Sequence, residues 1–277
     1  MCKECGCGLG GPIQVNGEPL NPSSLDDSSH DYGHSHESHP HDHDHAHPPA
    51  HQHLEVHQSL LQKNDRLAER NRGYFRAKHW LVLNVLSSPG SGKTTLVQKT
   101  AEHLRGRLRV GVVVGDLATD NDAARLRAAG IPVVQITTGT LCHLEAEMVA
   151  HAVERLQGDP LDLLIIENVG NLVCPAAYDL GEHLRVVLLS VTEGEDKPLK
   201  YPPVFHSAHA ALLTKMDLAQ AAGFDRERAL SNLRRISHHA RIFELSARTG
   251  QGMAEWCDFL TQQHRTHTSP PPSSAHA

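Results

Sequence analysis

The chain has 277 residues, and its 26 Lys and Arg against 32 Asp and Glu give a formal net charge of −6 with His neutral. This mild acidity argues against a protein that binds nucleic acid by neutralising phosphates. The sequence contains no run of 18 apolar residues, which excludes a membrane-spanning helix, and its N-terminus lacks the apolar region of a secretory signal. These features predict a soluble, cytoplasmic protein with one core of ordinary domain size.

The first 55 residues are rich in Gly, Pro, Ser, Asp and His and have almost no periodic apolar pattern. Such a segment cannot offset the entropy of ordering, so residues 1–55 are predicted to be disordered. Three cysteines at its start offer soft thiolates that suit zinc or nickel: Cys2, Cys5 and Cys7. Of the 23 histidines, eleven lie between His30 and His57. Five of them alternate strictly and are predicted to hold metal ions loosely, the alternative being an incidental polar linker: His39, His41, His43, His45 and His47.

The pattern changes at residue 56. Leucines at helical spacing among charged residues predict one amphipathic helix over 56–73, which Gly73 is expected to end. From 74 to 265, strand-like and helix-like segments alternate, and this part is predicted to be a single nucleotide-binding domain. The Pro/Ser-rich residues 266–277 are predicted to form a disordered tail.

Seven short apolar runs within this domain predict strands that are buried on both faces, with helices between several of them, for instance 94–105 and 143–156. The predicted strands are 80–86, 109–114, 132–136, 161–166, 185–191, 208–213 and 241–245. This order favours an α/β fold with a mostly parallel sheet flanked by helices.

The first strand is followed by Ser-Ser-Pro-Gly-Ser-Gly-Lys-Thr-Thr, which begins at Ser87 and opens a helix. Glycines let backbone N–H groups close around phosphates, and the helix N-terminus adds its positive dipole end. Lys93 is expected to reach the β and γ phosphates and Thr94 to ligate magnesium, although Ser87 replaces the first Gly of the usual pattern. The residues expected to line the phosphates are Pro89, Gly90, Ser91, Gly92, Lys93, Thr94 and Thr95.

The identity of the base is indicated by Thr-Lys-Met-Asp at 214–217, which directly follows an apolar strand. A carboxylate at Asp217 can accept hydrogen bonds from both N1–H and the 2-amino group of guanine, a donor pair that adenine lacks. Lys215 can lie along the base, and Thr214 stands where GTPases usually carry Asn. Ser246 and Ala247, after the last strand, resemble the last guanine-contacting loop of that class. The pattern therefore favours GTP over ATP.

Two acidic residues follow strands at the edge where α/β sheets bind ligands. Asp116 and Glu167 are expected to hold magnesium directly or through water, the alternative being surface carboxylates at the start of loops. The predicted catalytic residues are Lys93, Thr94, Asp116 and Glu167. No residue that positions the attacking water is evident in the sequence.

A further metal site is indicated inside the domain. Cys142 and His143 are adjacent, so a second copy from a symmetric partner would complete a tetrahedral ligand set. Cys174 lies seven residues after Glu167, on the loop expected to sense the γ-phosphate; if it joins the metal, nucleotide state and metal affinity are linked. Taken singly, a buried Cys is more often a small hydrophobe, and Cys257 is assigned to that class.

In combination, these motifs resemble the HypB family of hydrogenase nickel-incorporation GTPases. The resemblance covers nearly the whole chain, from the Cys2-x-x-Cys5-Gly6-Cys7 motif and the His-rich insert onward. Five further stretches carry it: 64–72, 115–119, 139–144, 167–175 and 194–202.

This resemblance implies a SIMIBI-like P-loop GTPase that uses GTP and Mg²⁺, binds Ni²⁺ and Zn²⁺, and forms a GTP-dependent homodimer. It also implies nickel delivery to the large subunit of a [NiFe] hydrogenase with a HypA-type chaperone, and a metal site at Cys142, His143 and Cys174. One alternative is a nickel or zinc storage protein with a vestigial GTPase. Another is a metallochaperone for urease or a zinc enzyme, although urease-type relatives usually show Cys-Pro-His at the metal motif.

Overall fold

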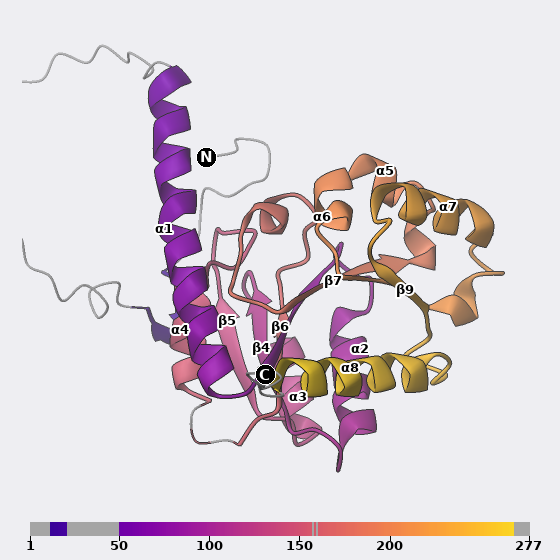
Figure 1. The fold of residues 1–277 in the computed structure, drawn as a ribbon, viewed down its shortest axis with the longest axis horizontal. Helices are drawn as coiled ribbons and strands as arrows, with labels where there is room; N and C mark the ends of the chain where they lie inside the picture. Colours follow the sequence, from indigo (N-terminus) through magenta and orange to yellow (C-terminus); the bar gives the residue numbers. More distant parts are fainter. Residues whose placement is uncertain (1–11, 21–49, 157, 159, 269–277) are drawn as a thin grey trace, which may run out of the picture.

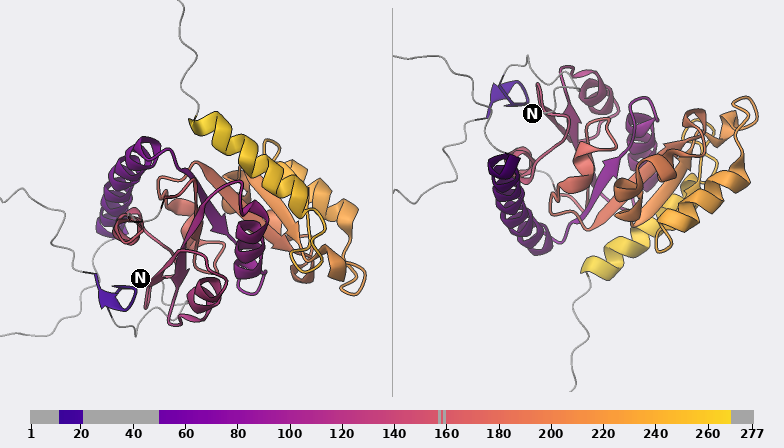
Figure 2. Two further views of the ribbon diagram at one scale, coloured as in Figure 1. Left: turned by 90° about the horizontal axis from the view of Figure 1, so that it is seen from below. Right: turned by 90° about the horizontal axis from the view of Figure 1, so that it is seen from above.

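The computed structural model describes residues 12–20, 50–156, 158 and 160–268. Its nine strands form one sheet with helices on both faces (Figures 1 and 2). The strands are β1 (Gln14–Val15), β2 (Glu18–Pro19), β3 (Leu81–Leu86), β4 (Val110–Asp116), β5 (Val133–Thr137), β6 (Leu163–Glu167), β7 (Leu184–Ser190), β8 (Ala210–Thr214) and β9 (Arg241–Glu244). The α-helices are α1 (Ala50–Ala77), α2 (Lys93–Leu104), α3 (Asn121–Ala128), α4 (Ala146–Glu154), α5 (Lys197–Lys200), α6 (Pro202–His206), α7 (Arg226–Ile236) and α8 (Met253–Thr268). Short 3-10 helices lie at Cys174–Ala177, Val191–Glu193 and Met216–Leu218.

The predicted α/β fold with a mostly parallel sheet is confirmed, and all seven predicted strands are present. Their order across the sheet is β2-β1-β5-β4-β6-β3-β7-β8-β9, and β3 to β9 pair in parallel. Strands β4 to β6 lie on one side of β3, and strands β7 to β9, which come later in the chain, lie on the other side. The direction in which successive strands are added to the sheet therefore reverses at β3. Ligands bind outside the carboxyl ends of strands at such a reversal.

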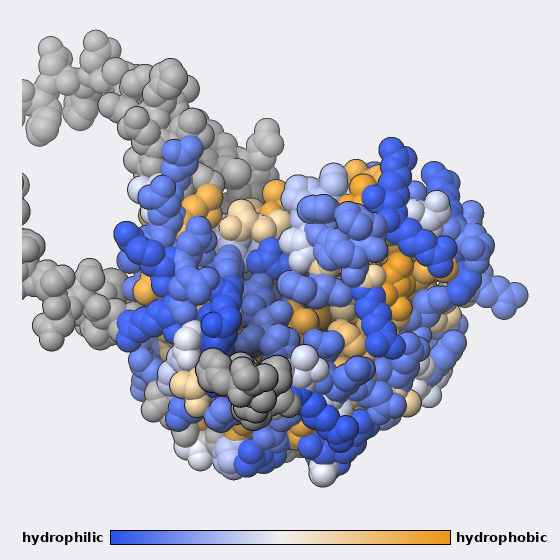
Figure 3. Space-filling view, viewed as in Figure 1, coloured by the Kyte–Doolittle hydropathy of each residue, from blue (hydrophilic) through white to orange (hydrophobic). Residues whose placement is uncertain are grey.

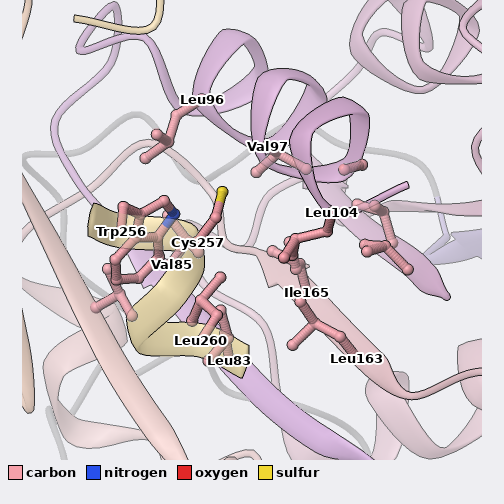
Figure 4. Packing of buried hydrophobic residues seen from close by; sticks show 14 of the residues in the cluster. Leu83, Val85, Leu96, Val97, Leu104, Leu163, Ile165, Trp256, Cys257 and Leu260 are labelled. Atoms are coloured by element: carbon pink, nitrogen blue, oxygen red, sulfur yellow. The ribbon is translucent and has the colours of Figure 1, made fainter. Parts of the chain in front are cut away.

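The core lies on both faces of this sheet because alternate residues of each strand point to opposite layers. Leu83 and Val85 of β3 pack with α2 and α8, as Figure 4 shows, whereas Val82 packs in a second cluster with α1 and α4. Cys257 is 1% exposed within the first cluster, and burial raises the pKa of its thiol to about 11. It therefore packs as a small hydrophobe at neutral pH, as its assignment predicted.

Helix α1 is longer than the predicted 56–73, because it runs through Gly73 to Ala77. The two aromatic residues after Gly73 explain the difference. Phe75 is 1% exposed and stacks on Trp80 at 6.3 Å between ring centroids, and Tyr74 meets Trp80 edge-on. Burial of these rings against the sheet outweighs the roughly 1 kcal/mol preference of glycine against helix.

Helix α1 also begins at Ala50, six residues before the predicted start, so the prediction that residues 1–55 are wholly disordered is wrong for residues 50–55 and for residues 12–20. Here β1 and β2 form a hairpin that adds antiparallel strands to β5 at the edge of the sheet. Asn16 and Gly17 have positive φ angles of 49° and 82°, as a tight two-residue turn requires. Asn16 also bridges to Gln135, and Val15 is 1% exposed. An Asn-Gly pair beside an apolar alternation was the sequence feature that could have revealed this hairpin.

Most of the face seen in Figure 3 is hydrophilic. Within the described residues, none of the helices combines the length and hydropathy needed to cross a membrane. The last helix, α8, continues to Thr268, three residues into the segment predicted as a disordered tail. The rest of that segment lies outside the described residues.

His183 gives the fold a pH dependence. Its Nδ1 accepts the N–H of Val82 at 3.1 Å, and burial, with a smaller contribution from the charge of His267, lowers its pKa from 6.5 to about 4. A depressed folded-state pKa means that the stabilisation is present above pH 6.5 and is lost as the pH falls from 6.5 to 4. His183→Asn keeps an acceptor near Nδ1 without the titration. We expect its melting temperature to fall less between about pH 7 and pH 5 than that of the wild type. Thermal unfolding measures this, with exposed His103→Asn as the control.

Candidate nucleotide and metal sites

The loop between β3 and α2 forms the candidate phosphate site. Gly90 and Gly92 adopt positive φ angles of 72° and 96°, a conformation that turns the backbone around an enclosed space. Lys93 is buried at the start of α2, and its Nζ donates to the Ser87 hydroxyl at 2.9 Å. Burial lowers the pKa of Lys93, and the nearby Glu167 opposes that shift. Ser87, the departure from the usual glycine, therefore holds the lysine in place.

A cavity of about 320 Å³ lies against this loop. It brings together the four predicted catalytic residues with glycines of the loop. The lining is Pro89, Gly90, Gly92, Lys93, Thr94, Thr95, Gly115, Asp116, Asp122, Arg125, Glu167, Asn168 and Gly170. Asp122 and Arg125, both on α3, were not identified from the sequence. Their spacing of three residues on a helix that follows Asp116 was the available indication, since such pairs share a face.

Glu167 lies beside the phosphate cavity at the end of β6. Its Oε1 accepts the Thr94 hydroxyl at 2.7 Å, while Oε2 is buried and, among the described residues, has no hydrogen-bond partner. Burial raises the pKa of Glu167 to about 7. A buried carboxylate oxygen without a donor, next to a hydroxyl oxygen, fits the ligand set that Mg²⁺ prefers.

Asp116 also reaches this cavity from the end of β4. Its Oδ1 accepts the backbone N–H groups of Ala118 and Thr119, each at 2.9 Å. The carboxylate therefore orders the first turn of its own loop. It faces the same space as Glu167 because the strands that carry the two residues, β4 and β6, are neighbours in parallel.

A second cavity, of about 440 Å³, lies on the other side of the phosphate loop and shares Gly92 and Thr95 with the first. It contains the residues predicted to bind the base, and its lining is Ser91, Gly92, Thr95, Leu96, Lys99, Thr214, Lys215, Asp217, Leu218, Leu245, Ser246, Ala247 and Arg248. A nucleotide can thus place its phosphates in one cavity and its base in the other.

Hydrogen bonds hold the base pocket to the phosphate loop. Thr214 donates its hydroxyl to the carbonyl of Ser91 at 3.0 Å, and Lys215 donates its Nζ to the carbonyl of Gly90 at 2.7 Å. Ser246 donates to Asp217 Oδ1 at 2.6 Å. Thr214 and Lys215 therefore link the base pocket to the phosphate loop, and Ser246 orients the carboxylate of Asp217.

The structure brings Cys142, His143 and Cys174 together. One ligand atom from each lies within 4.8 Å of the others, and the two sulfurs are 2.8 Å apart. The imidazole of His143 is buried, and neither ring nitrogen has a hydrogen-bond partner among the described residues. The ring stacks on Tyr178 at 3.9 Å, and the nearest Glu145 oxygen is 3.5 Å from Nε2. Two thiols and an unsatisfied imidazole suit zinc or nickel.

Asparagines connect this cluster to the nucleotide site. Asn168, directly after Glu167, accepts the N–H of Leu144 at 3.2 Å, and Asn171 donates to the carbonyl of Cys142 at 3.3 Å. Through Asn168 and Asn171, the loop after β6 is therefore hydrogen-bonded to the segment that carries Cys142 and His143.

Helix α1 supports the same segment from outside. Asn71 donates to the carbonyl of Ala146 at 2.8 Å, and Asn64 accepts the N–H of Ala146 at 2.9 Å. These hydrogen bonds satisfy the side chains of Asn64 and Asn71, and this is why two polar residues of α1 can be buried.

The N-terminal residues predicted as metal ligands all lie outside the described residues. They are Cys2, Cys5, Cys7, His39, His41, His43, His45 and His47.

The fold, the phosphate loop and the base pocket define a P-loop nucleotide-binding protein. The family model described as CobW/HypB/UreG, nucleotide-binding domain, matches residues 81–244. The hydrogenase maturation factor HypB of Azotobacter vinelandii is 53% identical over 213 residues, which cover 77% of this chain and 70% of the relative. That of Escherichia coli K12 is 43% identical over 292 aligned positions, which cover 95% and 99%. The chain therefore belongs to the HypB family.

Solved structures agree with this family. The crystal structure of HypB from Helicobacter pylori in complex with nickel is similar with a TM-score of 0.71 and 39% identity, over 78% of this chain and 99% of that one. The crystal structure of the hydrogenase maturation factor HypB from Archaeoglobus fulgidus is similar with a TM-score of 0.69 and 40% identity, over 73% and 99%.

Proposed function

We propose that this protein is a GTP-hydrolysing nickel metallochaperone of the cytoplasm, which assists nickel insertion into the large subunit of [NiFe] hydrogenase. The observation that carries the proposal is the cluster of Cys142, His143 and Cys174 on the same loops that border the phosphate cavity. The names of the relatives as hydrogenase maturation factors, and the nickel complex of the Helicobacter pylori protein, support it.

In this proposal Lys93 binds the β and γ phosphates of GTP, and Asp217, Lys215, Ser246 and the chain around Thr214 bind guanine. Thr94, Glu167 and Asp116 would hold Mg²⁺ directly or through water, and the ion would supply positive charge to the phosphates when GTP is hydrolysed to GDP and phosphate. Glu167, which accepts the hydroxyl of Thr94 and has a second oxygen without a partner among the described residues, would be one of the residues that hold the ion. The loop that begins at Asn168 and carries Cys174 directly follows this carboxylate, so the nucleotide site and the metal cluster would be linked through it.

The metal is cargo in this scheme. Cys2, Cys5 and Cys7 form a tight site at the N-terminus, and the His-rich segment collects further nickel. The domain cluster binds nickel or zinc, because two thiolates and an imidazole suit both ions. Two copies of the chain pair in the GTP state, and a HypA-type chaperone and the hydrogenase precursor receive the ion after hydrolysis.

The test is nickel binding to the full chain and to a Cys2/Cys5/Cys7→Ala variant, each with GDP and with a non-hydrolysable GTP analogue. We expect a site that survives the triple substitution and whose affinity differs between the two nucleotides. GTP turnover and the sedimentation of each state are measured in parallel, with dimers expected only with the analogue. Nickel affinity that ignores the nucleotide, with negligible turnover, would favour a storage protein.

A second candidate function, nickel delivery to urease, rests on one observation. The Helicobacter pylori relative, 39% identical over 216 residues, is named a hydrogenase/urease maturation factor. Measuring nickel transfer from the purified protein to the hydrogenase precursor and to apo-urease distinguishes the two functions.

Asn168 offers a direct test of the link between the sites. Its amide oxygen accepts the N–H of Leu144, and its Nδ2 donates to Asn84 at 3.1 Å. We expect Asn168→Ala to reduce the ratio of nickel affinities between the GTP-analogue and GDP states several-fold, within the 0.5–2 kcal/mol range of such couplings, about 2- to 30-fold. Competition with a chelator measures the ratio, and GDP affinity should stay close to that of the wild type.

The control for this substitution is Asn232→Ala, which removes an amide that donates to the carbonyl of Glu195 near α7. Equal nucleotide effects on nickel in Asn168→Ala and in the wild type would show that the coupling runs elsewhere.

A further inference from the structure

Three exposed histidines meet where helices α6 and α7 end, outside the sites described above. His206 is the last residue of α6, and His238 and His239 directly follow Ser237, which caps α7. The ring centroids are 6.3 Å apart for His206 and His238, 5.7 Å for His206 and His239, and 5.2 Å for His238 and His239. The cluster lies far from Cys142, His143 and Cys174 in sequence and combines two helix ends.

The backbone beneath the three rings is fixed. Ser237 is 1% exposed and donates its hydroxyl to the carbonyl of Phe205 at 2.7 Å, which joins the end of α7 to α6. The Nδ1 of His206 lies 3.2 Å from the carbonyl of Ile236. A carbonyl partner places the ring proton on Nδ1 and leaves Nε2 with a lone pair. Metal-binding histidines are oriented by such a bond to a backbone carbonyl.

The spacing of the rings suits one shared ion. A Zn–N bond of about 2.0–2.1 Å puts the centre of an imidazole about 3.2 Å from the metal, so two rings at a tetrahedral angle have centres about 5 Å apart, and at wider angles about 6 Å. The separations of 5.2 Å between His238 and His239 and of 5.7 Å between His206 and His239 fall in this range. The 6.3 Å between His206 and His238 is slightly larger, so a small rotation of the side chains is needed for all three rings to share one ion. The carbonyl end of α7 adds negative partial charge beside His238 and His239.

Among the described residues, only Cys142, His143 and Cys174 bring three such ligand atoms within 4.8 Å of one another, so the ring nitrogens of these histidines are more widely spaced. All three side chains are exposed and can turn about their χ angles within nanoseconds, so their ring nitrogens can approach one another by side-chain rotation.

We infer that His206, His238 and His239 form a surface site for one divalent transition-metal ion, with water completing its coordination. Three imidazoles suit Zn²⁺, Ni²⁺ and Cu²⁺. The site lies at the amino ends of β8 and β9, since Ala210 and Arg241 begin these strands shortly after the histidines. The nucleotide pockets lie at the carboxyl ends, on the opposite edge of the sheet. This site therefore goes beyond the proposed function and is independent of the nucleotide.

The test is histidine modification by diethyl pyrocarbonate on the full-length chain, read residue by residue by peptide mass spectrometry, with and without Zn²⁺. This readout separates the cluster from the N-terminal histidines. We expect Zn²⁺ to slow modification of His206, His238 and His239 together by at least about fivefold, as ligation occupies their lone pairs. His103 is the internal control, because its Nδ1 also faces a carbonyl, that of Lys99 at 2.8 Å, and no ring contact joins it to another imidazole in the described chain.

A second arm uses His238→Ala, which should restore modification of His206 and His239 in the presence of Zn²⁺, whereas His103→Ala should leave their protection intact. Unchanged modification of the three wild-type residues at Zn²⁺ concentrations that protect the N-terminus overturns the proposal. Protection of His206 and His239 that persists in His238→Ala overturns the shared site. A GTP analogue should leave the modification rates of His206, His238 and His239 unchanged. The result of this test is therefore independent of any effect of the nucleotide on the Cys174 loop.

Discussion

Replacement of Asp217 by Asn is expected to move the preference of the base pocket from guanine to xanthine nucleotides. In the proposed function the carboxylate of Asp217 accepts hydrogen bonds from both N1–H and the 2-amino group of guanine, whereas the amide of Asn would offer one acceptor and one donor. Xanthine has a carbonyl in place of the 2-amino group and matches the amide. Unpaired buried polar groups cost about 1–3 kcal/mol each, so GDP affinity should fall roughly 100-fold and XDP affinity should rise. Competition against a fluorescent nucleotide measures both.

Ser246→Ala is the matched control for Asp217→Asn. Ser246 donates to Asp217 Oδ1, so its loss should loosen the carboxylate and weaken guanine binding by a smaller factor without favouring xanthine. GDP binding by Asp217→Asn that equals that of the wild type would show that this carboxylate does not read the base. The predicted preference for GTP over ATP would then lose its support, whereas the prediction that the loop around Lys93 binds phosphates would be unaffected.

The sheet and the nucleotide site could be predicted from the sequence because each of their parts is local. A continuous apolar run indicates a buried strand, and the glycines before Lys93 indicate a loop that opens a helix. The spacing of Asp122 and Arg125 shows that they share one face of a helix, but it does not show that α3 turns this face toward the phosphate cavity. Their place depends on how the helix packs against the sheet.

The domain metal site was predicted only in part by residue chemistry. Cys142 and His143 are adjacent in the sequence, but their approach to Cys174 depends on the pairing of β6 with its neighbours and on the asparagines that bond the two loops. The hairpin at 12–20 was missed for a different reason. The composition of the surrounding segment is typical of disorder, and averaging over 55 residues hid a local Asn-Gly turn.

Replacement of Cys174 by Ala, in a background without Cys2, Cys5 and Cys7, is expected to abolish the effect of the nucleotide on nickel affinity. Cys174 brings its sulfur to the cluster with Cys142 and His143 and lies on the loop that follows Glu167. Loss of an outer partner of a metal ligand costs 10- to 100-fold in affinity, so loss of a ligand should cost roughly 100-fold or more. The difference in nickel affinity between GDP and the GTP analogue should disappear. Thiolate-to-nickel absorption and competition with a chelator measure both effects.

Cys257→Ala provides the control for Cys174→Ala, because it removes a sulfur from the packed core between α2 and α8 rather than from the metal cluster. It should lower thermal stability and leave nickel affinity unchanged in both nucleotide states. Unaltered nickel binding by Cys174→Ala with GDP and with the analogue would remove this cysteine from the site. Cys142 and His143 would then need ligands from the second copy in a dimer, and the nucleotide would act on metal release through subunit pairing.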